Sequence, residues 1–332
     1  MWRYREVLPV LENENIVSLG EGMTPMLTPL HLRKAQGLPQ LFIKDESSNP
    51  TGSFKARGLS AAISKAKEAG VTTCIIPTAG NAGGAMAAYC AAAGIHAIVV
   101  MPAHTPRAFK EECTFYNAEL ILQEGLISDC ARKVASIKAT TPCFDVSTMK
   151  EPYRLEGKKT MGYEIAEQLN WELPDIILYP TGGGTGLIGM WKAFDEMEQM
   201  GWIGSKRPRM YAVQASNCQP IVETWNGLQQ DARSYKGRPS LANGLAVPNP
   251  FAEKMIYKVL KESGGLPLAV SDEDMIASVR EIAREEGMLV APEGAALWHA
   301  LKQLLQKELV LHHEKIVLLN TGSGYKYMEN IV

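Results

Sequence analysis

The sequence lacks the features that mark secreted, membrane-spanning and metal-binding proteins. Its six cysteines are scattered without a C-x-x-C pair, which argues against a zinc site, a redox dithiol or a disulfide framework. It has no run of the roughly 18 apolar residues that a membrane helix needs, and its N-terminal stretch lacks the basic region and apolar core of a signal peptide. We therefore predict a cytoplasmic protein with no metal site.

The chain also lacks an excess of charge of either sign. Its 332 residues include 34 Lys and Arg and 36 Asp and Glu, giving a formal net charge of -2. A basic surface for nucleic acid or an anionic membrane is not indicated, so a small-molecule partner is expected. The length predicts about two domains, and we find no internal repeat or low-complexity segment.

Short apolar runs alternate with amphipathic stretches along most of the chain. Repetition of strand, loop and helix predicts parallel strands joined by right-handed crossovers. Strands are expected at 41–44, 73–77, 96–101, 175–179, 209–214 and 315–319. Helices are expected at 54–69, 106–116, 160–169, 187–200, 272–286 and 295–307, together with an alanine-rich helix that ends at Gly94. The polar stretch 150–159, which carries a proline and a glycine, is interpreted as a crossing between domains.

Lys55 lies in the stretch NPTGSFKARG, at a turn that opens a predicted helix. A partly desolvated lysine amine loses its proton readily and forms a Schiff base with an aldehyde. Lysines near a helix start are also often solvated surface charges. The stretch alone leaves both interpretations open.

A glycine-rich loop, PTGGGTG, follows the strand predicted at 175–179. Consecutive glycines let backbone N–H groups point inward at a helix start, which suits a phosphate, although glycines there also serve close packing. Gly184, Gly186 and Gly189 satisfy the G-x-G-x-x-G pattern of dinucleotide-binding folds. That pattern needs an acidic residue after the next strand, and Ala215 and Ser216 stand there instead, so we disfavour a nicotinamide site.

Two further corners follow predicted strands. Residues 78–82 place an asparagine and exposed amides at a helix start, which suits a carboxylate or a phenolic oxygen, or a simple asparagine cap. Residues 320–324 place Thr321 between an asparagine and a glycine. Its hydroxyl would suit a ring nitrogen, although threonine beside glycine is also ordinary turn chemistry.

Taken together, six motifs stand in the order EGMTP, NPTGSFKARG, TAGNAG, EPYRLEGKKT, PTGGGTG and NTGSGYK. In this set the chain resembles the pyridoxal-phosphate enzymes of the tryptophan synthase β type, also called fold type II, and most closely the threonine synthases. The resemblance spans nearly the whole chain. It implies an α/β fold of two open, twisted, mainly parallel sheets flanked by helices, with pyridoxal 5'-phosphate in the cleft between the domains. It also implies a large cofactor-binding domain over 1–52 and 153–332, a smaller mobile domain over 53–152, and a homodimer.

The resemblance also implies site residues. Lys55 forms the Schiff base and Phe54 lies beside the cofactor ring. Asn81 bonds the ring hydroxyl and Thr321 the ring nitrogen. The cofactor phosphate is held by Gly182, Gly183, Gly184, Thr185 and Gly186, and the substrate is held by Thr78, Ala79, Gly80, Lys150 and Arg154.

The implied reaction converts O-phosphohomoserine and water to threonine and phosphate, through an external aldimine, proton transfer by Lys55, γ-elimination and β-addition. The sequence departs from the threonine synthase pattern at Ala82 and at Thr148, Met149 and Lys150, where groups that help bind the substrate phosphate are expected. The stretch 241–247 resembles that of the dehydratases. A threonine or serine ammonia-lyase, or another β-elimination or replacement on a substituted amino acid, is therefore the alternative. A nucleotide-binding oxidoreductase or a non-catalytic binding protein is a third possibility.

Overall fold

The computed structural model describes residues 1–228, 231 and 235–331. Contacts divide the chain into two compact units. Unit 1 comprises Met1–Met23 and Asn49–Thr160, and unit 2 comprises Thr24–Ser48 and Met161–Val332. This division groups the first 23 residues with the smaller unit, whereas the sequence placed them in the large domain. The predicted domain boundaries and the roles of the domains stay predictions.

Unit 1 is built on a parallel sheet with the strand order β5-β4-β3-β6. The strands are β3 (Thr73–Pro77), β4 (His96–Pro102), β5 (Glu119–Gln123) and β6 (Phe144–Asp145). In β3, Cys74, Ile75 and Ile76 are all buried, as expected for a parallel strand that is covered on both faces. Ile75 lies opposite Ile98 of β4, which fixes the register of the centre of this sheet.

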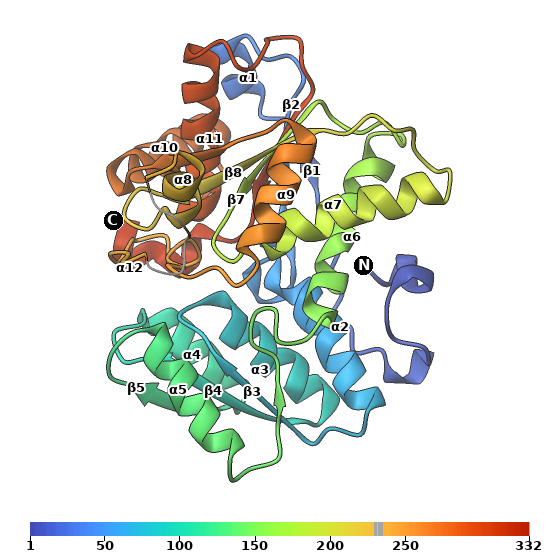
Figure 1. Ribbon diagram of the computed structural model, residues 1–332, viewed down its shortest axis with the longest axis vertical. Coiled ribbons are helices and arrows are strands. Elements are labelled where there is room, and N and C mark those ends of the chain that lie inside the picture. Colours follow the sequence, from blue (N-terminus) through green and yellow to red (C-terminus); the bar gives the residue numbers. More distant parts are fainter. Residues whose placement is uncertain (229–230, 232–234, 332) are drawn as a thin grey trace. The chain divides into compact units, whose positions relative to one another are not determined.

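Helices cover the sheet of unit 1. They are α2 (Lys55–Glu68), α3 (Asn81–Ala93), α4 (Arg107–Phe115) and α5 (Ile127–Lys138). Figure 1 shows α5 across the front of the strands, and its Cys130 and Val134 pack on Ile75. Helix α3 ends at Gly94, whose φ of 68° is a left-handed conformation that glycine adopts without strain.

The N-terminal arm of unit 1 packs against α2. Met1 and Leu8 form an apolar cluster with Ala61. The buried carboxylate of Glu21 accepts hydrogen bonds from Ser60 Oγ at 2.7 Å and from Tyr89 Oη at 2.5 Å. These contacts explain why the arm belongs to unit 1.

Unit 2 is built on a larger, mainly parallel sheet with the order β1-β2-β10-β7-β8-β9, in which only β1 runs antiparallel to its neighbour. The strands are β1 (Met26–Leu27), β2 (Leu41–Asp45), β7 (Ile176–Pro180), β8 (Arg209–Ala215), β9 (Pro267–Val270) and β10 (Ile316–Asn320). All five residues of β7 are buried, as are all five of β10, so the core lies at the centre of the sheet.

Helices flank the sheet of unit 2. They are α1 (Leu30–Gln36), α7 (Thr185–Gln199), α8 (Pro220–Trp225), α9 (Glu253–Ser263), α10 (Asp272–Glu286), α11 (Pro292–Gln306) and α12 (Met328–Ile331). Figure 1 shows α9 in front of β7 and β8. Helix α10 begins where Ser271 Oγ accepts a hydrogen bond from the Asp274 amide, and three acidic residues in its first turn suit the helix dipole.

Helix α6 (Tyr153–Gln168) takes in most of the stretch 150–159, whose interpretation as a crossing between domains stays a prediction. The helix begins at Tyr153 rather than at Thr160, and the division between the units falls inside it, after Thr160. Three charged residues of this stretch, Arg154, Lys158 and Lys159, are buried, whereas Lys150 is exposed. In unit 2 the same helix supplies Glu164, which forms a fully buried ion pair of 2.8 Å with Lys44 of β2.

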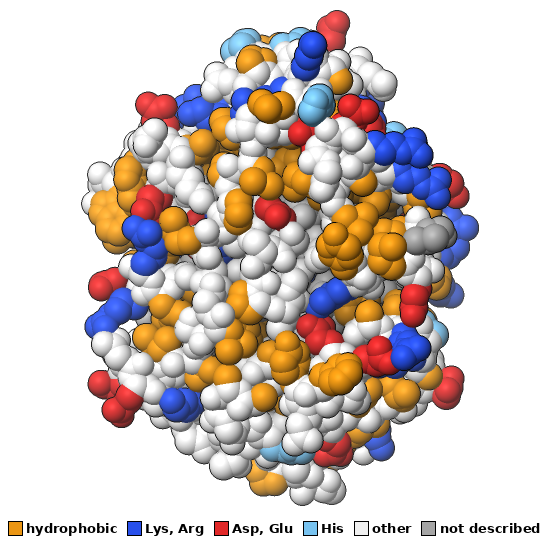
Figure 2. Space-filling model, turned by 180° about the vertical axis from the view of Figure 1, so that it is seen from behind, with side chains coloured by type: hydrophobic (Ala, Val, Ile, Leu, Met, Phe, Trp, Pro, Cys, Tyr) orange, Lys and Arg blue, Asp and Glu red, His pale blue; other side chains and the backbone are white. Residues whose placement is uncertain are grey.

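The predicted fold class of two mainly parallel sheets flanked by helices is confirmed. Every strand expected from the sequence is present within one or two residues of its expected bounds. The elements that were not predicted are strands β1, β5, β6 and β9 and helices α1, α5, α8, α9 and α12. None of the described helices is both long and apolar enough to cross a membrane. Figure 2 shows acidic and basic side chains interspersed on the face it displays, as the balanced charge predicts.

Candidate active site

Lys55 is the first residue of α2, directly after Phe54 at the helix N-cap. The turn before it, Pro50–Gly52, includes Thr51 and Gly52 with φ angles of 61° and 63°. The Lys55 side chain is half-buried, and its Nζ lies 4.0 Å from the centroid of the Phe54 ring. Lys55 is therefore not an ordinary solvated surface lysine.

Arg154 lies in the same unit and is only 3% exposed. Its Nη1 donates to the Val146 carbonyl oxygen at 2.6 Å, and its backbone N–H donates to Glu151 Oε2 at 3.0 Å. Its Nε has no hydrogen-bond partner among the described residues. A buried guanidinium with a donor to spare is suited to an anionic ligand.

Lys158 stands one helical turn after Arg154 on α6 and is 1% exposed. Its Nζ lies 5.2 Å from the centroid of the Phe54 ring, the ring that Lys55 also contacts. Burial lowers the pKa of Lys158 well below its usual value, and the positive charges of Arg154 and Lys55 lower it further, while Glu151 opposes them. Burial also raises the pKa of Glu151 and lowers that of Arg154.

The corner at residues 78–81 precedes α3, which packs against α2 and against the turn at Pro50–Gly52. Gly80 is the N-cap residue and makes no side-chain cap bond, while Asn81 is the first helical residue. Asn81 is therefore not the cap of this helix. Thr78 Oγ1 accepts a hydrogen bond from the Gly80 amide at 3.2 Å, which fixes the turn whose amides we expect to face a carboxylate. Lys150, in contrast, is exposed.

In unit 2 the glycine-rich loop links β7 to α7. Gly184 is the N-cap of α7 and has a left-handed φ of 73°, and the first amide that donates within the helix is that of Ile188, to Gly184 O at 3.0 Å. The backbone N–H groups that come before Ile188 in this first turn have no helical carbonyl acceptor four residues earlier. Amides at a helix N-terminus, with the helix dipole, form a site for an anion such as phosphate.

The loop has no room for side chains at two of its glycines. A Cβ on Gly182 would collide with the Gly244 carbonyl oxygen, and a Cβ on Gly186 would collide with Tyr179 Oη. The Gly186 amide donates to the Tyr179 hydroxyl, and burial of that hydroxyl raises its pKa well above the usual value. Gly182 and Gly186 are therefore needed for close packing, and the Gly186 amide is already bonded to Tyr179.

Glu293, in the first turn of α11, holds the neighbouring segment in place. The carboxylate is 5% exposed, and its Oε1 accepts from the Gly244 amide and from Tyr327 Oη, both at 2.8 Å. Glu293 is not among the residues predicted from the sequence, although the turn signal in APEG directly before an apolar helix marks its position. Lys158 was also not predicted, because no local pattern indicates its burial, and Tyr179 was predicted only as the end of a strand.

The third corner, residues 320–324, follows β10. Thr321 is 6% exposed, so its neutral hydroxyl is buried. The corner is held by a bridge between Val290 and Ser323 and by the Ala291 amide, which donates to Gly322 O at 3.0 Å. Beside it, Asn320 Nδ2 donates to Asp45 Oδ1 at 2.7 Å, so the corner is fixed on both sides.

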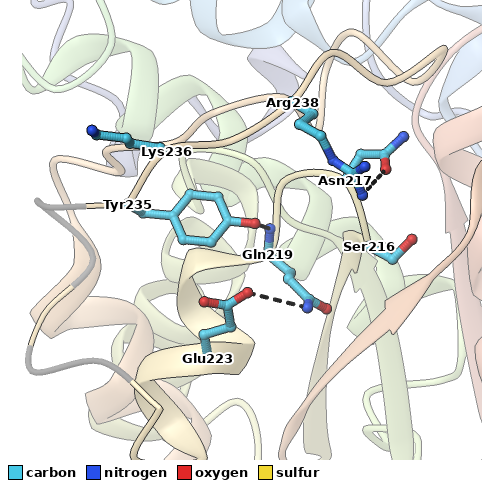
Figure 3. Close-up of a pocket in the computed structure, with 7 residues that line it drawn as sticks. All are labelled: Ser216, Asn217, Gln219, Glu223, Tyr235, Lys236 and Arg238. Carbon is cyan, nitrogen blue, oxygen red and sulfur yellow. Dashed lines mark hydrogen bonds between the residues drawn. The ribbon is translucent and has the colours of Figure 1, made fainter.

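A separate cavity of about 550 Å³ opens after β8 in unit 2 (Figure 3). It is lined by Ser216, Asn217, Gln219, Glu223, Tyr235, Lys236 and Arg238, none of which is a predicted site residue. Its polar groups bond to one another: Arg238 Nη2 donates to Asn217 Oδ1 at 3.1 Å and Gln219 Nε2 donates to Glu223 Oε1 at 3.3 Å. The cavity is therefore distinct from the predicted site.

Comparison with known proteins decides which family these motifs represent. A family model described as pyridoxal-phosphate dependent enzyme matches residues 17–322. The chain belongs to this family. Its cofactor is accordingly pyridoxal phosphate, and the nicotinamide interpretation is set aside.

Curated relatives of this pyridoxal-phosphate-dependent enzyme include threonine synthases. That of Methanocaldococcus jannaschii is 35% identical, over 98% of this chain and 80% of that protein. That of Methanosarcina acetivorans is 32% identical, over 100% of this chain and 81% of that protein. The chain is therefore a homologue of threonine synthases along its full length.

Solved structures share the fold at lower identity. Maize serine racemase superimposes with a TM-score of 0.79 at 20% identity, covering 98% of this chain and 96% of that one. An L-serine ammonia-lyase from Rhizomucor miehei superimposes with a TM-score of 0.77 at 22% identity, covering 94% and 99%. These likenesses establish the fold type II architecture and nothing further.

The residues present fit pyridoxal phosphate. Unit 1 offers a half-buried lysine amine on an aromatic ring, and Ser53 next to it has a fully buried hydroxyl without a partner in the described part of the chain. Unit 2 offers the N-terminus of α7, which follows a glycine-rich loop, for a phosphate. It also offers the buried neutral hydroxyl of Thr321 for a ring nitrogen. An aldehyde, a phosphate and a pyridine nitrogen each find a chemically matched group.

Proposed function

We propose that the enzyme is a lyase of the threonine synthase type, which converts O-phosphohomoserine and water to threonine and inorganic phosphate. The observation that carries the proposal is the buried guanidinium of Arg154, which has an unused donor and lies in unit 1 with Lys55. A buried cation of this kind favours a substrate that carries an anionic group besides its carboxylate. The full-length relationship to threonine synthases supports the same substrate.

The proposed roles follow the chemistry of each group. Lys55 binds the cofactor aldehyde, Gly182 to Gly186 bind its phosphate, and Phe54, Asn81 and Thr321 contact its ring. When bound, pyridoxal phosphate draws electron density from the α-carbon of the amino acid joined to it. Thr321 supplies a neutral hydroxyl rather than a carboxylate, which favours elimination and replacement over transamination.

The substrate is held and deprotonated by groups of unit 1. The backbone at Thr78, Ala79 and Gly80 binds the substrate carboxylate, and Arg154 binds the substrate phosphate. The Lys55 amine accepts the α-proton as general base, because a lysine that is partly desolvated gives up its own proton readily. Over the whole reaction the bond from Cγ to the phosphate oxygen breaks, and water adds its oxygen at Cβ.

A hydroxy-amino-acid ammonia-lyase, or another β-elimination or replacement, is the second candidate. Ala82 is apolar and buried, and Lys150 and Thr148 are exposed, so three positions expected to help with a substrate phosphate do not offer buried polar groups. An uncharged β-hydroxyl substrate such as threonine needs none of them.

The two candidates are separated by offering the enzyme O-phosphohomoserine and threonine in parallel, while recording inorganic phosphate, threonine and 2-oxobutanoate. Threonine synthase activity predicts release of phosphate with formation of threonine. Production of 2-oxobutanoate from threonine, without phosphate release from the other substrate, would contradict it. An Arg154→Ala variant should lose turnover of the phosphorylated substrate far more than any turnover of threonine.

A further inference from the structure

Two cationic side chains of α6 share one face of the helix. Arg154 and Lys158 stand four residues apart and so lie one turn above the other. A Cβ on Gly58 of α2 would meet the Arg154 carbonyl oxygen at 2.8 Å and Lys158 Cε at 3.0 Å. The absence of a side chain at Gly58 thus lets α6 approach α2 closely, at the turn of α2 that follows Lys55.

The next lysine along the helix shows that this arrangement is specific to Lys158. The Lys159 ammonium forms an ion pair of 2.7 Å with Glu156, one turn earlier on the same helix. The Lys158 amine lies over the Phe54 ring, which Lys55 contacts as well. Lys55, Arg154 and Lys158, whose side chains are cationic when protonated, therefore gather in one region of unit 1, where Arg154 and Lys158 are buried and Lys55 is half-buried.

The cluster of Lys55, Arg154 and Lys158 also has acidic neighbours. Glu151 acts on both α6 cations, and Asp145 acts on Arg154, although Asp145 also bonds Lys138 at 2.8 Å. On α2 the charged group that acts on Lys158 is Lys55, and the Arg57 guanidinium of the same helix bonds Thr160 Oγ1 at 3.0 Å. Buried like charges repel strongly because little water screens them, so an anion at this position would be strongly favoured.

We propose that Lys158 is a second anion-binding side chain beside Arg154, and that the Lys158 amine takes up a proton when the phosphate of the substrate binds. The identity of the anion rests on the proposed function. In the enzyme without that anion, burial and its cationic neighbours hold the Lys158 pKa low, so the amine tends toward its neutral form. A bound dianion reverses the local field, and the neutral amine plus one proton from solvent becomes an ammonium that donates to the anion.

The same arrangement explains how the enzyme manages without buried polar side chains at two positions, where Ala82 is apolar and Thr148 is exposed. A lysine that charges only when the anion is present avoids the cost of a permanently buried third cation. It also makes Lys158 a residue that discriminates phosphorylated substrates from threonine or serine.

The test is calorimetric titration of the holoenzyme with inorganic phosphate, in two buffers of different ionisation enthalpy at about pH 8.5, well above the second pKa of a phosphate group. The wild type should take up protons on binding. Lys158→Met, which replaces the amine by an apolar side chain of similar length, should bind phosphate about tenfold or more weakly and without proton uptake. Lys158→Arg, which is always charged, should keep much of the affinity and lose the proton uptake. Lys67→Gln, an exposed lysine on α2, is the matched control and should behave as the wild type does.

Phosphate binding by Lys158→Met with wild-type affinity and wild-type proton uptake would overturn the inference, as would a wild type that binds phosphate without taking up protons. Because inorganic phosphate is not turned over, the result is independent of the reaction. Proton-linked phosphate binding in an enzyme that proves to be an ammonia-lyase would sink the proposed function and leave the role of Lys158 intact. The opposite outcome is also distinguishable. If the enzyme releases phosphate from O-phosphohomoserine but Lys158→Met titrates with phosphate as the wild type does, the proposed function stands and the role of Lys158 is refuted.

Discussion

The amines of Lys55 and Lys158 lie over the same aromatic ring, at 4.0 and 5.2 Å from the centroid of Phe54. The two lysines come from different helices and differ in burial, since Lys55 is half-buried and Lys158 is 1% exposed. A cofactor aldehyde can reach a half-buried amine at a helix start. A fully buried amine is better suited to bind an anion that lies next to it. This difference assigns them separate tasks in the proposed enzyme.

Lys158 should make the stability of the protein depend on pH. Its pKa in the folded state lies below the usual lysine value of 10.5, so between these two values the unfolded chain carries a proton that the folded chain lacks. The free energy of unfolding should therefore rise with pH across this window, by up to about 1.4 kcal/mol per pH unit. Urea unfolding without phosphate at pH 7, 8 and 9 should show a shallower rise for Lys158→Met than for the wild type or for Lys67→Gln. Equal slopes for all three proteins would mean that Lys158 stays charged in the folded state.

Gly186→Ala should weaken cofactor binding. The new methyl group would collide with Tyr179 Oη and displace the loop, at a cost of about 1–3 kcal/mol, or roughly 5- to 150-fold in the dissociation constant. Tyr179→Phe would leave the ring carbon Cζ in collision with the new methyl group, so the ring itself must be removed. Gly186→Ala combined with Tyr179→Leu should therefore bind pyridoxal phosphate more tightly than Gly186→Ala alone. Fluorescence titration of the apoenzyme with the cofactor measures this. A double variant no better than the single one would show that the collision is not what matters.

Glu293→Ala should destabilise the protein. The substitution leaves the Gly244 amide and the Tyr327 hydroxyl without their shared acceptor, and hydrogen bonds to a charged group contribute about 1.5–3 kcal/mol each. Glu293→Gln keeps an acceptor oxygen and is the matched control, with a smaller loss expected. Urea denaturation compares the three proteins. A Glu293→Ala variant as stable as the wild type would rule out this role.

Most of the fold could be predicted from the sequence because its strands are short apolar runs bounded by glycine and proline. Strands β3, β4, β7 and β10 are of this kind. Strand β5 was missed because its residues, ELILQ, begin and end with polar side chains and lie partly exposed. The start of helix α6 at Tyr153 was missed because the charged residues Arg154, Lys158 and Lys159 give no sequence sign that they are buried.

The candidate site could be predicted where function requires a local pattern, and not where it requires a contact between distant segments. Lys55 and Gly182 to Gly186 stand in glycine-rich turns, which can be recognised from the local sequence alone. Lys158 lies 103 residues after Lys55, and neither its burial nor its place over Phe54 has a sequence signature. The residues that tune and support the site therefore became visible only in the folded structure.

The central claim, that Lys55 carries the cofactor, is tested most directly by reducing the holoenzyme with borohydride, digesting it and locating the pyridoxyl group by mass spectrometry. The proximity of a second amine makes the experiment decisive. The account predicts the added mass on the peptide that contains Lys55, and loss of the visible absorbance of lysine-bound pyridoxal phosphate in Lys55→Ala. Labelling of Lys158, or a Lys55→Ala variant that keeps the visible band without any added amine, would contradict it.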